Sequence, residues 1–342
     1  MKDHPMQTPK PVIASANHLV SRRCVLGTLA ALGAAPAAMA QDAAFPSRAV
    51  TWVVPYAAGG FGDALSRVLA QKMSERFKQP VVVDNRPGAG GQIGANYVKQ
   101  QPADGYTVLY GDIGPFALNA SLYPKLSYDT LKDYTPLTTL FNSRLVVVVP
   151  ASSPINSFAD LIAAAKTPKG LNYGSYGAGS QPHVWTEMLK QRIQGNLTHI
   201  PYKGAAPALQ DLIGGRLDMM CDVTPSSIPL VREGKLKALA LVGSDKGIAQ
   251  LPGIPSLTEL GYPDLNLPGW NGVVVRAGTP AAVVARLHAE ILAALQLPDV
   301  VQRYEALGLS LAVQSPQQFS QFIAEQTRQW GNTIQRAGIT LE

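Results

Sequence analysis

The chain has 342 residues, of which 46% are apolar and 15% are charged, against about 25% charged in an average globular domain. This composition excludes a disordered chain, and the length suits two domains or one large one. Residues 1–40 hold four basic residues and one acidic residue, so the formal net charge of +6 becomes +3 without them, from 25 basic and 22 acidic residues. Because no run of Lys and Arg is longer than two, the sequence excludes nucleic acid as a partner.

The first forty residues have the pattern of a secretory signal peptide. Residues 24–40 carry no charge, follow Arg22 and Arg23, and end in the small residues typical of a cleavage site. A membrane anchor is the alternative reading, but the apolar part is too short to cross a hydrocarbon core of about 30 Å. We therefore expect residues 1–40 to be removed from a soluble protein that works in the periplasm.

The route of export stays open at the sequence level. Residues 21–26 resemble the twin-arginine motif, but Val25 stands where that motif usually carries Phe, so the general secretory route is the alternative. Cleavage of the signal would leave Cys221 as the single cysteine, which excludes an internal disulfide.

Beyond the signal, short β-branched runs alternate with amphipathic stretches, which predicts an α/β protein with parallel or mixed sheets. A helix is expected from about Asp63, with that residue as its N-cap. The expected strands are 50–55, 81–83, 107–110, 145–149, 171–173, 197–200, 219–223, 236–241 and 272–275. Further helices are expected through Ala95 and Val98, after Ser157, Gly179, Gly204 and Pro225, and over 280–295, 298–307 and 316–337.

The order of these elements predicts two lobes. Residues 41–149 and 271–342 are expected to form lobe 1, and residues 150–270 are expected to form lobe 2. Two chain crossings, near 150 and 270, would then make a two-strand hinge.

Searches for chemical motifs are negative. No nucleotide-binding loop GxxxxGK[ST] is present, and residues 88–94 miss the dinucleotide pattern GxGxxG by one residue. Ser175 lacks the glycine two positions before it that a nucleophile elbow needs. No histidine forms HExxH or pairs with cysteine at zinc spacing. We therefore predict no catalytic residues, no metal and no cofactor.

Gly/Ser-rich loops recur between predicted strands and helices, at 58–60, 88–91, 177–180 and 203–205. Free backbone N–H groups at a helix N-terminus favour an anion, and glycine lets a ligand approach the backbone closely. In open α/β sheets such loops gather beyond the carboxyl ends of the strands, where ligands bind. The loops therefore indicate capture of a small anion, with plain tight turns as the alternative.

The chain resembles the substrate-binding proteins of tripartite tricarboxylate transporters, the Bug-type periplasmic receptors, along its whole mature length. The resemblance rests on WVVPYAAGG at 52–60, VDNRPGAGG at 83–91, PADGYT at 102–107, LNYGS at 171–175, PYKG at 201–204 and GRLD at 215–218. It implies a two-lobed periplasmic-binding-protein fold, each lobe a mixed sheet flanked by helices, with a ligand cleft between the lobes.

The resemblance also implies a site and partners. One ligand carboxylate would be held between the lobes by backbone amides and ordered waters, and the closed protein, a monomer, would deliver it to the membrane permease subunits of the transporter. The candidate ligand-binding residues are Tyr56, Ala58, Gly59, Gly60, Phe61, Asp63, Arg144, Ser175, Tyr176, Gly179, Ser180, His183, Tyr202, Gly204 and Asp222.

Several candidates depart from the family's common pattern. Phe61-Gly62 replaces Pro-Thr, Tyr176 stands where a small residue is common, and Cys221-Asp222-Val223 replaces Phe-Asp-Asn. Two aromatic walls at Phe61 and Tyr176 would suit a flat aromatic carboxylate such as a terephthalate-like diacid. An aliphatic dicarboxylate or tricarboxylate is the alternative ligand, and packing is the alternative role for the aromatic side chains.

Two charged candidates carry their own alternatives. Arg144 could pair with a second carboxylate, or it could be solvated. His183 could form a local hydrogen bond instead of titrating for function. A sensor that docks on a membrane signalling protein remains an alternative function, as does an exported α/β enzyme using Asp63, Asp222 or His183.

Overall fold

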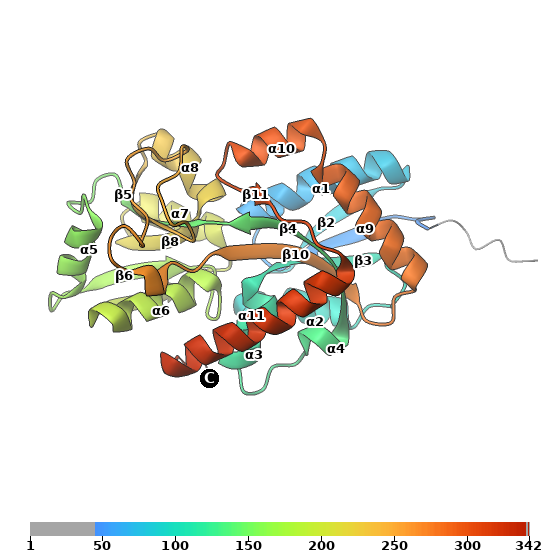
Figure 1. The fold of residues 1–342 in the computed structure, drawn as a ribbon, viewed down its shortest axis with the longest axis horizontal. Coiled ribbons are helices and arrows are strands. Elements are labelled where there is room, and N and C mark those ends of the chain that lie inside the picture. Colours follow the sequence, from blue (N-terminus) through green and yellow to red (C-terminus); the bar gives the residue numbers. More distant parts are fainter. Residues whose placement is uncertain (1–44, 340, 342) are drawn as a thin grey trace, which may run out of the picture. The chain divides into compact units, whose positions relative to one another are not determined.

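The structure is a computed structural model that describes residues 45–339 and 341, so the predicted signal peptide lies outside the described residues. Two mixed sheets, each flanked by helices, organise this part of the chain (Figure 1). The predicted α/β class with two mixed sheets is therefore confirmed.

The first sheet has six strands in the order β11-β4-β10-β3-β1-β2. Neighbours β1, β2 and β3 are parallel, while β10 runs antiparallel to both β3 and β4. The strands are β1 (Val50–Val54), β2 (Val81–Asn85), β3 (Thr107–Asp112), β4 (Tyr134–Ser143), β10 (Gly269–Arg276) and β11 (Ser310–Leu311).

Alternating side chains on these strands bury both faces of the sheet under helices. Trp52 packs with α1 and α9 on one face, whereas Val53 packs with α2 and α11 on the other. The elements around this sheet are α1 (Phe61–Phe77), η1 (Ala89–Gly91), α2 (Gln92–Lys99), η2 (Gly114–Leu118), α3 (Asn119–Leu122), α4 (Thr130–Asp133), α9 (Ala281–Leu295), α10 (Pro298–Glu305) and α11 (Pro316–Arg336).

The second sheet has five strands in the order β7-β6-β8-β5-β9. The strands are β5 (Leu145–Pro150), β6 (Leu171–Ser175), β7 (Leu197–Pro201), β8 (Met219–Val223) and β9 (Leu236–Val242). Val146 packs with α7 (Ala205–Ile213) and α8 (Thr224–Arg232), and Val147 packs on the opposite face with α5 (Phe158–Ala165) and α6 (Gln181–Ile193). A short turn, η3 (Pro263–Leu265), precedes the return to the first sheet.

The chain passes from the first sheet to the second at Arg144, because β4 ends at Ser143 and β5 begins at Leu145. The prediction assigned residues 145–149 to lobe 1, but β5 pairs with β8 and β9 in the second sheet. The return crossing lies between Val242 and Gly269. The lobe boundaries themselves remain a prediction.

Two further differences from the sequence prediction have local causes. Helix α1 begins at Phe61 with Gly60 as N-cap, so Asp63 lies inside the first turn, where a carboxylate still stabilises the helix dipole. Strand β4 was not predicted, since Pro136 interrupts its β-branched pattern; a register shift in its pairing with β10 lies beside that proline.

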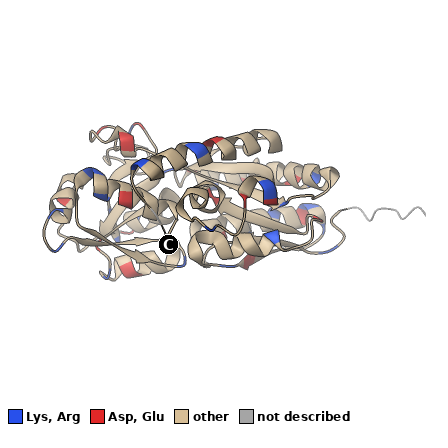
Figure 2. Ribbon diagram, turned by 90° about the horizontal axis from the view of Figure 1, so that it is seen from below, with Lys and Arg blue, Asp and Glu red and all other residues tan. Residues whose placement is uncertain are grey.

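Basic and acidic residues are interspersed along the described chain (Figure 2). No single helix in residues 45–339 is long and apolar enough to cross a membrane; only the bent pair of α9 and α10, taken together, has the required length and composition.

Candidate ligand-binding site

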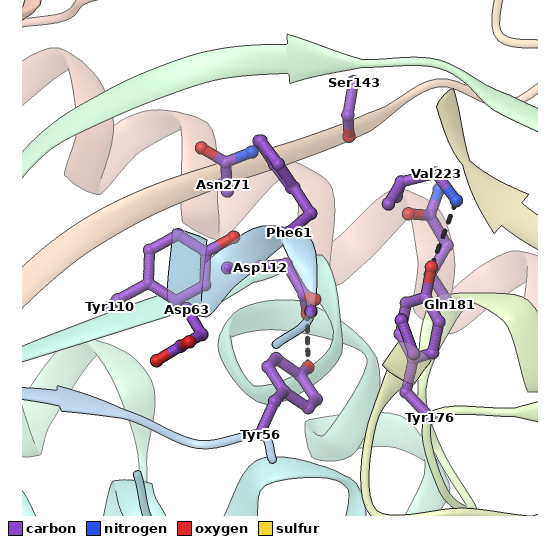
Figure 3. A pocket seen from close by; sticks show the side chains of 13 residues that line it. Tyr56, Phe61, Asp63, Tyr110, Asp112, Ser143, Tyr176, Gln181, Val223 and Asn271 are labelled. Carbon is purple, nitrogen blue, oxygen red and sulfur yellow. Dashed lines mark hydrogen bonds between the residues drawn. The ribbon is translucent and has the colours of Figure 1, made fainter. Parts of the chain in front are cut away.

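A cavity lies between the two sheets, beyond the carboxyl ends of their parallel strands (Figure 3). Both sheets contribute to it: lining residues come from β3, β4 and β10 of the first sheet, from β8 of the second, and from the loops that follow β1 and β6. Its lining consists of Tyr56, Gly60, Phe61, Gly62, Asp63, Tyr110, Asp112, Ser143, Tyr176, Gln181, Ala205, Val223 and Asn271.

Four helices start at this cavity. Gly60 is the N-cap of α1 and Val223 is the N-cap of α8, while Gln181 and Ala205 are the first residues of α6 and α7. A Cβ atom on Gly60 would lie 3.7 Å from the Cβ atom of Ala205, so α1 and α7 begin side by side. Helix N-termini present N–H groups and the positive end of the helix dipole, which together favour an anion.

Positive side-chain charge does not contribute to this preference. None of the described residues that line the cavity is Lys, Arg or His. Any anion in the cavity would therefore be held by backbone N–H groups and neutral side chains.

The loops around the cavity touch each other directly. The Ala57 N–H donates to the Lys203 carbonyl at 2.8 Å, joining the loop after β1 to the loop after β7. The Tyr123 hydroxyl donates to the Ala178 carbonyl at 2.9 Å. These contacts join segments that follow different sheets, so the structure has the geometry of a closed site.

A tyrosine–aspartate pair stands at the end of the first sheet. The Tyr56 hydroxyl donates to Asp112 Oδ1 at 2.9 Å (Figure 3). The Gly114 N–H donates to the same oxygen at 2.9 Å. Burial raises the pKa of Asp112 to about 6, although both hydrogen bonds act in the opposite direction.

A second such pair stands at the end of the second sheet. The Tyr176 hydroxyl donates to Asp222 Oδ1 and accepts the Val223 N–H at 3.1 Å, while the Ser227 hydroxyl donates to Asp222 Oδ2. Burial raises the pKa of Asp222 to about 6 as well. The rings of Tyr56 and Tyr176 meet edge to face, with centroids 6.1 Å apart, so the two pairs adjoin each other.

Five of the candidates predicted from the sequence line the cavity: Tyr56, Gly60, Phe61, Asp63 and Tyr176. The Asp63 carboxylate is already engaged, because it accepts the Gly59 N–H at 3.0 Å and pairs with Arg67 at 2.9 Å. Burial would raise the pKa of Asp63, but these hydrogen bonds bring it below its ordinary value.

Other candidates stand behind the lining, from the end of β6 to the first turn of α6. The Ser175 hydroxyl lies 2.6 Å from Nε2 of His199 and donates to the Gly177 carbonyl, and the Ser180 hydroxyl donates to the same carbonyl. His183 accepts the Gly179 N–H at 3.2 Å, and burial lowers its pKa. These groups shape the loop before α6 through internal hydrogen bonds.

The remaining candidates lie away from the lining. Arg144 donates to the Gly308 carbonyl at 2.8 Å and faces a separate pocket beside Trp270. The Tyr202 hydroxyl donates to Asp211 at 2.6 Å.

Gly204 has a φ of 145° and passes close to the backbone of Ala57, which only glycine does without strain. Ala58 lies in the loop before α1, Gly59 lines a neighbouring groove, and Asp222 lies behind Tyr176.

The lining residues that were not predicted from the sequence include the polar groups Asp112, Ser143, Gln181 and Asn271, and also Tyr110. One signal was available, because Asp112 follows a predicted strand and side chains at carboxyl ends of parallel strands gather at one edge of a sheet. Ser143 and Asn271 had no such signal, since their strands were unpredicted or misplaced at that end. The described residues bring no three His, Cys, Asp or Glu side chains together in a metal-binding arrangement.

The family model and the related proteins that match this chain agree on one family. The family described as "Tripartite tricarboxylate transporter family receptor" matches residues 65–339. A UPF0065 protein from the tcbD-tcbE intergenic region of Pseudomonas sp. (strain P51) is 37% identical over 318 residues, covering 92% of this chain and 94% of that protein. Protein BugT of Bordetella pertussis is 34% identical over 320 residues, covering 93% of this chain and 98% of BugT.

Solved structures agree with the fold. The periplasmic binding protein BugD superimposes with a TM-score of 0.82 at 32% identity, and R. palustris Rpa4515 with adipate superimposes with 0.82 at 34%; each covers 87% of this chain and 100% of the other. MatC of Rhodopseudomonas palustris with bound malate gives 0.81 at 30% identity, covering 85% of this chain and 100% of MatC. The chain therefore belongs to the tripartite tricarboxylate transporter receptor family, the Bug-type solute-binding proteins, which are receptors and not enzymes.

Proposed function

We propose that this protein is a periplasmic receptor that closes around a small organic carboxylate and delivers it to the membrane permease of a tripartite tricarboxylate-type transporter. The observation that carries the proposal is the convergence of four helix N-termini on one cavity without a cationic side chain in its lining. This arrangement suits an anion whose charge is spread over two oxygens.

Hinge closure is the mechanism we infer. Closure requires a ligand that binds the closed state better than the open one. A carboxylate that accepts N–H groups from α1 of the first half and from α7 of the second meets that requirement, because opening would break half of its hydrogen bonds. The direct contact of Ala57 with Lys203 adds to the closed state beside the ligand.

We infer the ligand class from the ligands of related structures and from the residues that line the cavity. Adipate and malate in the related structures favour an aliphatic carboxylate. Because Phe61 and Tyr176 both line the cavity, a flat aromatic carboxylate is the second ligand class that we propose. Export to the periplasm, through the predicted signal peptide, and docking on a permease are part of the proposal because the family consists of transporter receptors.

A thermal-shift screen tests the receptor function. Residues 41–342 are heated with aliphatic dicarboxylates, tricarboxylates, acidic amino acids and aromatic mono- and dicarboxylates. A ligand at 100 times its Kd should add about 2.7 kcal/mol to the free energy of unfolding and raise Tm. The absence of a shift with every anion would contradict the proposal.

Replacement of Gly60 tests the site. Gly60→Asp should lower carboxylate affinity by about 100-fold or more, because a second negative charge repels the ligand and its oxygens compete for the N–H groups of α1. The fold should persist, since the φ of Gly60 is −82° and a Cβ atom there meets only ordinary contacts. Gly60→Asn matches the size without the charge and should lose much less affinity in a calorimetric titration. Equal losses in both variants would argue against an anion at this position.

A further inference from the structure

Asp112 has an unused oxygen in the cavity. The hydrogen bonds that Asp112 accepts from Tyr56 and Gly114 both end at Oδ1. No other described residue donates to Oδ2, and Asp112 lines the cavity (Figure 3). This oxygen is therefore an acceptor that faces the space where a ligand would lie.

The charge on Asp112 has no cationic partner in the described part of the chain. The cavity lining includes no Lys, Arg or His, and none of the ion pairs there involves Asp112. With its pKa raised by burial to about 6, the carboxyl is mainly ionised at pH 7. Because Asp112 is partly buried and has no counter-ion, its charge needs hydrogen-bond donors.

Neutral donors stand in another part of the lining. Gln181 is 5% exposed, and its Nε2 is buried without a hydrogen-bond partner among the described residues. A Cβ atom on Gly269 would lie 2.5 Å from Gln181 Oε1 and 2.6 Å from Ser143 Oγ, so these two polar groups sit together around that glycine. Since Gln181 opens α6, its amide and the helix N-terminus form one uncharged, anion-binding patch.

The cavity thus carries donors at the α6 patch and an anionic acceptor at Asp112. We propose that Asp112 determines ligand specificity by accepting a hydrogen bond from a hydroxyl or ammonium group of the ligand, so that the receptor selects hydroxy- or amino-substituted carboxylates over their unsubstituted counterparts. This inference rests on the proposed function, because it assumes that the cavity holds a carboxylate.

The opposite orientation is electrostatically unfavourable. A ligand carboxylate placed against Asp112 would bring two negative charges together inside a buried site, where repulsion is stronger than in water. A hydroxyl or ammonium group at the same place satisfies Oδ2 and adds no repulsion. The ligand carboxylate then points toward Gln181 and the helix N-termini.

The test compares ligands that differ by one donor. Isothermal titration at pH 7.5 measures L-malate against succinate, L-aspartate against succinate, and 4-hydroxybenzoate against benzoate. The wild-type protein should bind the substituted member of at least one pair about tenfold more tightly, the ratio expected for one hydrogen bond to a charged group.

Asp112→Asn is the deciding variant. It keeps an oxygen for Tyr56 and Gly114 but replaces Oδ2 with a donor, so it should abolish or reverse the preference within the pair. Asp299→Asn is the control, since it removes one negative charge at an exposed residue of α10 that pairs with Lys72; its preference should match the wild type.

The outcomes separate the two hypotheses. If no carboxylate binds the wild type, the proposed function is wrong and this inference fails with it. If carboxylates bind but the wild type shows no preference within any pair, the inference alone is overturned. It is also overturned if Asp112→Asn weakens both members of a pair equally, because Asp112 would then only position Tyr56.

Discussion

The two sheets end in the same arrangement, and they use it differently. In each, a tyrosine just beyond one parallel strand donates its hydroxyl to an aspartate near the end of the neighbouring strand: Tyr56 to Asp112 across β1 and β3, and Tyr176 to Asp222 across β6 and β8. Both tyrosines are 8% exposed. The two tyrosines are therefore matched in their hydrogen bond and in burial, which makes the differences between their aspartates informative.

The difference lies in the second carboxylate oxygen. Asp222 Oδ2 accepts the Ser227 hydroxyl, and the residue is 0% exposed and outside the cavity lining. Asp112 Oδ2 accepts no hydrogen bond from the described residues and belongs to the lining. A carboxylate with both oxygens satisfied by its own half is structural, whereas one with a free oxygen toward the cavity is available to a ligand.

The largest expected effect concerns the buried charge of Asp222. Its pKa is raised from 3.8 to about 6 by burial, so the stability it contributes is fully present below pH 3.8 and is lost as pH rises through 6. A shift of that size corresponds to about 3 kcal/mol. Between pH 4 and pH 7 the wild type should lose about that much free energy of unfolding relative to Asp222→Asn, which keeps an acceptor for Tyr176 but cannot ionise.

Urea unfolding at four pH values from 4 to 7 measures this difference. Only the wild-type minus variant value is used, since other carboxylates titrate in both proteins. A difference that stays constant over this range would show that Asp222 is not a buried charge of the kind described.

Removal of the Tyr176 hydroxyl should have the next largest effect. Tyr176→Phe leaves Asp222 Oδ1 without its donor and the Val223 N–H without its acceptor, both in a closed interior. We expect a loss of about 2 kcal/mol in the free energy of unfolding at pH 7, the usual cost of a buried hydrogen bond to a charged group. Chemical denaturation checks this value, and a neutral result would mean that the Tyr176–Asp222 contact does not stabilise the fold.

The elements that could be predicted from the sequence are those with a local signal. The β-branched runs identified nine strands, and the Gly-rich loops indicated the N-termini of α1, α6 and α7, because both signals are local. Strand β4 was not predicted, because Pro136 breaks the local pattern, whereas pairing with β10 stabilises the strand. The position of β5 in the second sheet also depends on partners more than 70 residues away in sequence, β8 and β9.

The site residues divide in the same way, into those with a local sequence signal and those whose place depends on strand pairing. Tyr56, Gly60 and Tyr176 could be proposed because they lie in recognisable loops. Asp112 could not, since a lone aspartate after a strand has no motif and its role follows from the lateral pairing of β1 with β3. Arg144 shows the converse: its charge suggested a ligand contact, yet the crossing between the sheets directs it to the Gly308 carbonyl.

The smallest effect, and the sharpest test of the comparison, is expected from Tyr56→Phe. Asp112 Oδ1 would keep the Gly114 N–H, and the cavity beside it gives water access to the carboxylate, so the loss should be about 1 kcal/mol or less. Because Tyr56 and Tyr176 are equally buried and lose the same hydroxyl, a difference between their Phe variants reports the environment of the two aspartates together with the Val223 N–H, which only Tyr176 accepts. Denaturation of the two variants in parallel at pH 7 decides the matter. If Tyr56→Phe costs as much as Tyr176→Phe, Asp112 is as enclosed as Asp222, and its second oxygen is not open to a ligand.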